Sequence, residues 1–87
     1  MRYRLNKGFN SQKINQQTVI FDSETSVFYY FNQTAQLILN KLKSGWDCQK
    51  IADYITSNYD VKKERSLKDV KQIISQLTKK SIITPIE

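Results

Sequence analysis

The stretch VFYYFNQTAQLILNKLKSG, from Val27 to Gly45, decides the fold. It opens with β-branched and aromatic residues, which predict a strand over Val27–Phe31. Asn32 stands where the N-cap of a following helix belongs, because its side-chain oxygen can accept a backbone N–H of the first turn. Gly45 can adopt the left-handed conformation that ends a helix. Between these two residues, apolar side chains recur at helical spacing at Leu37, Ile38 and Leu42.

Both faces of the predicted strand are apolar. Because successive side chains of a strand point to opposite sides, Val27, Tyr29 and Phe31 share one face, and Phe28 and Tyr30 share the other. One face can pack on the core. The other needs a cover, which a helix of the same chain or a binding partner could provide.

Two further strands precede this one. TVIF at Thr18–Phe21 is β-branched and aromatic, and the turn-prone segment DSET separates it from Val27–Phe31, so the two segments predict a hairpin. Phe9–Ile14 predicts a weaker and more polar strand, and the pattern does not define the rest of residues 1–15. We expect a meander in which the first and third strands are the edges.

Two more helices follow the first. Asp47 is the expected N-cap of the second helix. Ser66 and Asp69 have the spacing of a capping box, which predicts that the third helix begins at Ser66. The apolar stripe of the second helix consists of Ile51, Tyr54, Ile55 and Tyr59, and that of the third consists of Leu67, Val70, Ile73, Ile74 and Leu77.

The chain after the third helix is short. An apolar tail at Ile82 and Ile83 is expected to stop at Pro85. The order is therefore three strands and then three helices, which predicts an α+β fold with a three-stranded antiparallel sheet.

The composition argues against catalysis. The chain has 87 residues, no histidine, one cysteine and two glycines. These counts exclude the usual zinc sites, Cys-His and Ser-His nucleophiles, imidazole acid–base catalysis and a glycine-rich phosphate loop. The acidic residues form no recognisable pair. We expect one domain over residues 1–87 that is not an enzyme and uses no metal and no cofactor.

Charge and hydropathy suggest where the protein works. The net charge of +6 invites a nucleic-acid partner, but lysine and arginine lie singly or in pairs along the chain. The N-terminus lacks the apolar segment of a signal peptide, and no apolar run approaches the ~18 residues of a membrane span. A lone cysteine is typical of a reducing compartment. We expect a cytoplasmic protein that binds neither membrane nor nucleic acid.

The exposed strand edge suggests a binding function. Natural proteins usually protect an edge with charge, proline or a bulge, and VFYYF has none of these. An extended peptide could add to such an edge as a further strand. About four or five main-chain hydrogen bonds at a net ~1 kcal/mol each barely meet an association cost of ~4–15 kcal/mol. Pockets for two or three apolar ligand side chains, at ~1.5–3 kcal/mol each, would have to supply the rest.

The combined motifs resemble those of the PqqD-like family, the small peptide-binding domains known as RiPP precursor recognition elements. Members show a hydrophobic-Asn-x-Thr-Ala segment after an aromatic strand, a glycine between two helices, an Ile-Ala or Ile-Val pair, and an Asp-Val near the start of the last helix. The corresponding positions here are Phe31-Asn32-Gln33-Thr34-Ala35, Gly45, Ile51-Ala52 and Asp69-Val70. The resemblance covers nearly the whole chain, although the polar first strand departs from the family pattern.

The resemblance implies a winged-helix-like fold without catalytic activity. It implies that the leader segment of a ribosomally made precursor peptide binds as a strand beside Val27–Phe31, in a cleft walled by the helix Ser66–Leu77, and is presented to maturation enzymes such as a leader peptidase and a cyclase. The chain is most similar to the stand-alone recognition proteins of lasso-peptide clusters, with the cofactor pathway that named the family second. The implied peptide-binding residues are Val27, Phe28, Tyr29, Tyr30, Phe31, Asp69, Val70, Ile73 and Leu77.

Two other hypotheses stay open. The polar face of the third helix suits a winged-helix DNA-binding protein, whose affinity would fall steeply with salt. The connection from Tyr59 to Ser66 is longer than a helix-turn-helix allows, and few residues remain for a wing, which argues against it. The third hypothesis is a homodimer that pairs exposed strand edges, so we expect a monomer or a weak homodimer. The lysine-bearing polar face consists of Lys68, Lys71, Gln72, Ser75 and Lys79.

Overall fold

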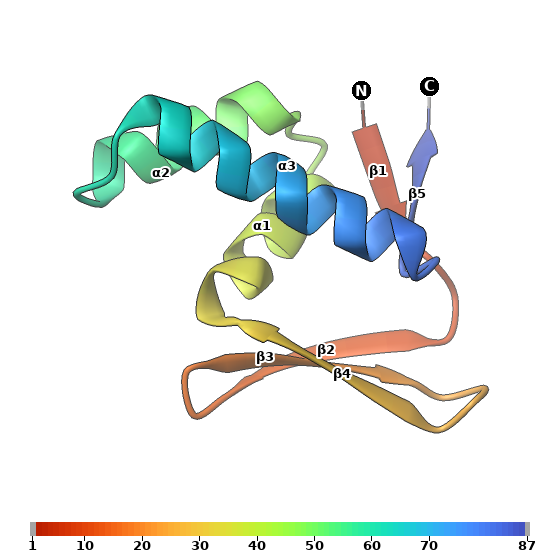
Figure 1. Ribbon diagram of the computed structural model, residues 1–87. Helices are drawn as coiled ribbons and strands as arrows, with labels where there is room; N and C mark the ends of the chain where they lie inside the picture. Colours follow the sequence, from red (N-terminus) through yellow and green to blue (C-terminus); the bar gives the residue numbers. More distant parts are fainter. Residues whose placement is uncertain (1, 87) are drawn as a thin grey trace.

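The computed structural model describes residues 2–86. In this range the elements are β1 (Arg2–Leu5), β2 (Phe9–Ile14), β3 (Gln17–Asp22), β4 (Val27–Asn32), α1 (Gln33–Lys43), α2 (Cys48–Asn58), α3 (Lys63–Lys79) and β5 (Ile83–Ile86). Figure 1 shows the three helices on one side of the sheet formed by β2, β3 and β4, while the other side of that sheet faces away from them.

The sheet has the strand order β2-β3-β4, and its neighbours are antiparallel. The register places Ile20 of β3 between Ser11 of β2 and Tyr29 of β4. The predicted α+β class, with a three-stranded antiparallel sheet followed by three helices, is confirmed. The likeness to winged-helix proteins stays a prediction.

A second sheet joins the two ends of the described chain. Strands β1 and β5 pair antiparallel, with Arg2 opposite Ile86 and Leu5 opposite Ile83. The expectation that the tail stops at Pro85 is wrong, because β5 continues through this residue. Proline lacks a backbone N–H but is tolerated in edge strands, and both strands of a two-stranded sheet are edges. The pairing joins segments at opposite ends of the sequence, so no local pattern reveals it.

Asn6 fixes this junction between the chain ends. Its backbone N–H donates to the carbonyl of Ile82 at 2.9 Å, and its side-chain amide donates to the carbonyl of Ser81 at 2.7 Å. The hydroxyl of Thr84 donates to Asn6 Oδ1 at 2.8 Å. Ile82 and Ile83, which follow α3, are thereby held in the core.

The predicted ends of α1 and the predicted start of α2 are confirmed. Asn32 Oδ1 accepts the backbone N–H of Ala35 at 3.0 Å, and Asp47 Oδ1 accepts that of Lys50 at 2.8 Å. Gly45 has a φ of 90°, the left-handed conformation expected after a helix. The Asn32 cap starts α1 immediately after the last residue of β4.

The predicted start of α3 is wrong. The helix begins at Lys63, its N-cap is Lys62, and within the described chain no side chain caps it. Ser66 lies inside the helix with 1% of its surface exposed, and its hydroxyl accepts a hydrogen bond from Thr56 Oγ1 at 3.1 Å. Lysine, glutamate and arginine favour helices, so the helix extends beyond the capping-box pattern.

The longer α3 also changes the connection that precedes it. Only residues 59–62 join α2 to α3, so the argument from a long connection against a helix-turn-helix is wrong. The residues after α3 form β5 and pair with β1.

The core lies between the helices and the inner face of the β2-β3-β4 sheet. Strand β3 contributes Ile20, and every helix contributes apolar residues at helical spacing. Within residues 2–86, no helix combines the length and the apolar composition that crossing a membrane requires. The buried apolar residues of the helices are Ala35, Ile38, Leu39, Leu42, Ile51, Ala52, Ile55, Val70, Ile73, Ile74 and Leu77.

Candidate peptide-binding site

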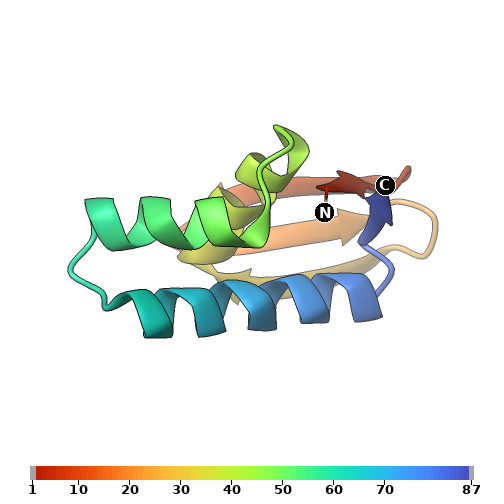
Figure 2. The same cartoon turned by 90° about the horizontal axis from the view of Figure 1, so that it is seen from above.

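Strand β4 forms one edge of the sheet. It pairs with β3 on one side, and no strand of residues 2–86 pairs with its other side. The hydroxyl of the buried Thr18 donates to the carbonyl of Asn32 at 2.7 Å, which fixes the end of β4 to β3. Figure 2 shows α3 extending along the side of the sheet on which β4 lies. The edge strand is therefore held to β3 on one side, and a long helix extends along its open side (Figure 2).

The five predicted strand residues separate into two sets. Tyr29 and Phe31 are half-buried and pack against the core cluster, whereas Phe28 and Tyr30 are 54% and 64% exposed on the opposite face. Val27 follows the alternation of Tyr29 and Phe31 but is itself exposed. In a strand added to β4, the helix-facing side chains would therefore lie beside Tyr29 and Phe31. The outward-facing side chains would lie beside Phe28 and Tyr30.

The predicted residues of α3 lie at different depths. Val70 and Leu77 are fully buried, and Ile73 retains 8% exposure, so these three form the apolar base of the helix rather than its surface. Asp69 is exposed, and its carboxylate lies 3.8 Å from Arg65 Nε. The capping role expected for Asp69 is wrong, since α3 begins well before it.

Asp69 also lines a cavity of about 480 Å³ at the end of β4. Gln33 and Thr34, the first residues of α1, line the same cavity, so it continues from the point at which the strand ends. The oxygen Oε1 of Gln36 is buried there, and it has no hydrogen-bond partner among residues 2–86. The cavity offers polar groups to a ligand that extends beyond β4.

The sequence reasoning missed one residue of this region. Lys80 follows the last turn of α3, and its Nζ lies 5.5 Å from the centre of the Tyr29 ring. Its spacing from Asp69 and Ile73 places it on the same flank of the helix, which is a signal that the sequence contains.

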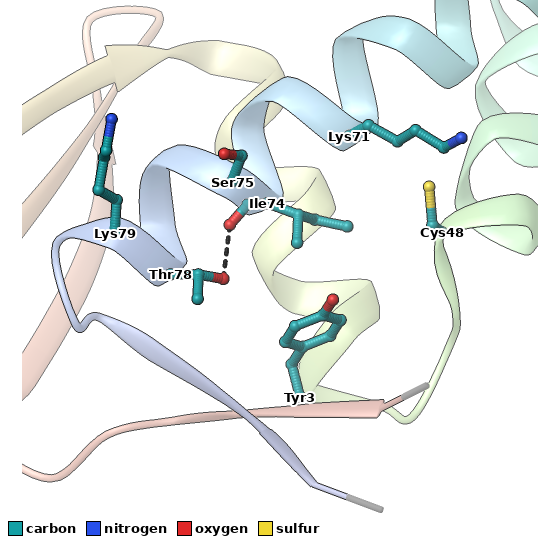
Figure 3. Close-up of a pocket in the computed structure, with 7 residues that line it drawn as sticks. All are labelled: Tyr3, Cys48, Lys71, Ile74, Ser75, Thr78 and Lys79. Carbon is teal, nitrogen blue, oxygen red and sulfur yellow. Dashed lines mark hydrogen bonds between the residues drawn. The ribbon is translucent and has the colours of Figure 1, made fainter.

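The opposite flank of α3 borders a different cavity. It has a volume of about 560 Å³ and lies between α3, β1 and the start of α2 (Figure 3). Tyr3, Cys48 and Lys71 line it, and the hydroxyl of Thr78 donates to the carbonyl of Ile74 at 2.7 Å beside it. Burial raises the pKa of the Cys48 thiol. In the part of the chain that the structure describes, no cluster of His, Cys, Asp or Glu could hold a metal ion.

The sequence matches a known protein family. Residues 17–83 match the family described as coenzyme PQQ synthesis protein D (PqqD). The match extends from β3 through the start of β5 and includes the open edge, the three helices and both caps. The chain belongs to the PqqD family. No curated protein sequence matches it significantly.

Two solved structures share the fold. One is described as lasso peptide synthetase B1 complexed with the leader peptide; it has a TM-score of 0.86 and 22% identity, and the match covers 98% of this chain and 100% of that chain. The other is described as TbiB1 in complex with the TbiA(beta) leader peptide; it has a TM-score of 0.79 and 18% identity, with 97% and 98% covered. At these identities the similarity concerns the fold, including its first strand β1.

Proposed function

We propose that this protein captures the leader segment of a ribosomally synthesised precursor peptide as an added β-strand and presents it to maturation enzymes. The observation that carries the proposal is the outer edge of β4, which no strand within residues 2–86 occupies. Membership of the PqqD family supports it, and so do the two related structures that contain leader peptides.

The surroundings of the edge suit an extended peptide. Main-chain hydrogen bonds to β4 would fix the strand, but their net contribution of ~1 kcal/mol each is too small to give tight binding alone. Tyr29 and Phe31 are half-buried against the core cluster, so apolar ligand side chains could pack on them. Each such side chain adds ~1.5–3 kcal/mol if it is fully buried. We propose that the peptide-binding residues are those expected from the resemblance, with Val70 and Leu77 acting as buried support.

The outer face of the sheet supports the presentation step. Phe28 and Tyr30 are exposed there, and the Phe28 ring lies 4.7 Å from that of Phe21. By strand alternation this face carries no charged residue among the strand residues of β2, β3 and β4, although charged residues make up 25% of the chain. Uncharged aromatic surface is typical of protein–protein interfaces. The outward-facing side chains are Asn10, Gln12, Ile14, Gln17, Val19, Phe21, Phe28 and Tyr30.

Strand β4 forms the open edge of the sheet and also part of its outer face. A leader bound at the edge would therefore extend the sheet whose outer face is proposed to contact the enzyme. We propose a leader peptidase as the first partner and a cyclase as a further one. The fold shared with lasso peptide synthetase B1 favours a lasso-peptide pathway. We further propose that residues 1–87 work as one non-catalytic cytoplasmic domain without a cofactor, as a monomer or a weak homodimer.

The test uses a synthetic leader peptide from the precursor gene nearest to the gene of this protein. In a paired strand, alternate ligand amides point at the neighbouring strand. Two N-methylated peptides are compared with the unmodified peptide by calorimetric titration. One is methylated at two odd-numbered residues of the leader, and the other at two even-numbered residues, so that only one of them loses amides that point at β4. We expect one set to weaken binding by about tenfold or more and the other to change it little, since lost hydrogen bonds cost ~1 kcal/mol or more each.

Duplex DNA titrated at rising salt concentrations serves as the control for the DNA-binding hypothesis. Leader binding should tolerate salt, whereas DNA binding would fall steeply with it. Equal effects of the two N-methylated sets would contradict strand addition, and tight, salt-sensitive DNA binding without peptide binding would contradict the whole proposal.

A further inference from the structure

Lys80 extends from the end of α3 toward β4. Its backbone N–H donates to the carbonyl of Gln76 at 3.1 Å, so the helix fixes its position. Its ammonium lies 5.5 Å from the centre of the Tyr29 ring, on the helix-facing side of the edge strand. A cation within about 6 Å of an aromatic ring is weakly attracted to it. The side chain therefore spans from α3 to the strand to which the leader is proposed to pair.

The positive charge of Lys80 has no acidic partner within residues 2–86. The ion pairs of this range join Lys63 to Asp53 and Arg65 to Asp69. Asp69 lies on the same flank of α3, but its charge is already compensated by Arg65 at 3.8 Å. Lys80 therefore gives this flank an excess of positive charge at the end that lies beside Tyr29.

The neighbouring lysine lies on the other side of the helix. Lys79 lines the cavity that contains Tyr3 and Cys48, where Figure 3 labels it. Both lysines are exposed and lie at the same helix end, so the favourable interaction of a cation with the helix dipole applies to both. The contact with β4 distinguishes Lys80.

We propose that Lys80 is a specificity-determining residue that selects leader segments with an aspartate or glutamate opposite Tyr29. This inference rests on the proposed function. In an added strand, the side chain directly opposite Tyr29 has its Cβ about 4.5–5.5 Å from that of Tyr29. A carboxylate at that position lies within reach of the Lys80 ammonium, which would exchange a weak aromatic contact for a charge-assisted hydrogen bond.

The test is a selection that requires no known precursor. A displayed library of random 15-residue peptides is selected separately on the wild-type protein, on Lys80→Glu and on the matched control Lys79→Glu. We expect Asp or Glu to be enriched at one fixed position by the wild type and by Lys79→Glu, and Lys or Arg at that position by Lys80→Glu. Circular dichroism checks that each variant is folded.

A direct measurement follows with one peptide from the wild-type selection and its acid-to-amide analogue. We expect the amide peptide to bind the wild type about three- to tenfold more weakly than the acid peptide does. This loss lies between those expected for an exposed ion pair and for a charge-assisted hydrogen bond. The two peptides should bind Lys80→Gln equally well. An acidic preference that persists in Lys80→Glu, or enrichment without any charge preference, would overturn the inference alone. Failure of the wild type to enrich any peptide would overturn the proposed function together with it.

Discussion

Cys48 is the first residue of α2 and borders the cavity beside α3. Desolvation by burial is the largest influence on its thiol and raises the pKa; Lys71 opposes this effect and Asp47 adds to it. The pKa is raised although a helix N-terminus usually favours the thiolate. The thiol is consequently a poor nucleophile at neutral pH.

This state of Cys48 can be measured by alkylation. At pH 8 we expect iodoacetamide to react more slowly with native Cys48 than with the same residue in urea-unfolded protein, because a raised pKa reduces the thiolate fraction. The difference should narrow as the pH rises above the native pKa. Lys71→Gln removes the cation that lowers the pKa, so it should slow the native reaction further. Equal native and unfolded rates would contradict this account.

At the scale of elements, the two aspartates that the sequence predicted as helix caps should differ in their contribution to the free energy of unfolding. Asp47 accepts a backbone N–H at the start of α2, whereas Asp69 lies well inside α3. We expect Asp47→Ala to lower the free energy of unfolding by about 1 kcal/mol and Asp69→Ala to change it by less than about 0.5 kcal/mol. Urea unfolding followed by circular dichroism measures both. A larger loss with Asp69→Ala than with Asp47→Ala would restore the capping box that the sequence predicted.

The elements that local pattern predicts are those whose signals are local. The change from strand to helix at Asn32 was predictable because alternation, cap and helical spacing follow one another directly. The start of α3 was not, because Ser66 has the residue type of a cap but is buried by its contact with Thr56 on α2. The β1–β5 pair was missed because its two strands are short and meet only through the tertiary fold.

The same distinction applies to the candidate site. The edge position of β4 follows from the order of three consecutive strands, so the sequence indicates it. The depth of Val70 and Leu77, and the reach of Lys80 to Tyr29, depend on how α3 is placed over the sheet. Periodicity indicates the flank of a helix on which a residue lies but not which neighbour that flank meets.

At the scale of the whole molecule, mutations should separate two proposed functions of β4: leader binding at its open edge and enzyme binding on the outer face of the sheet. Tyr30 is 64% exposed on the outer face, away from the helix-facing side chains. We expect Tyr30→Lys to weaken binding to the proposed leader peptidase partner by about tenfold or more, because aromatic residues at the centre of an interface often contribute 2 kcal/mol or more. Leader affinity, measured by fluorescence anisotropy, should fall less than peptidase affinity, because Tyr30 lies beside only the outward-facing side chains of an added strand.

Gln17→Lys provides the matched control, because it adds the same charge on the same face but at the neighbouring strand β3. Its effect on peptidase binding should be smaller than that of Tyr30→Lys. An unchanged affinity of Tyr30→Lys for the peptidase would show that the enzyme docks elsewhere.

The β1–β5 pair has a practical consequence for these measurements. Arg2 and Ile86 lie opposite each other, and Figure 1 shows β1 and β5 beside the helices, with their outer ends pointing away from the β2-β3-β4 sheet. A fluorophore, a surface tether or a fused protein joined at either end would thus leave the molecule from the same place. An immobilised copy would keep β4 turned toward the solution, whichever end carries the attachment.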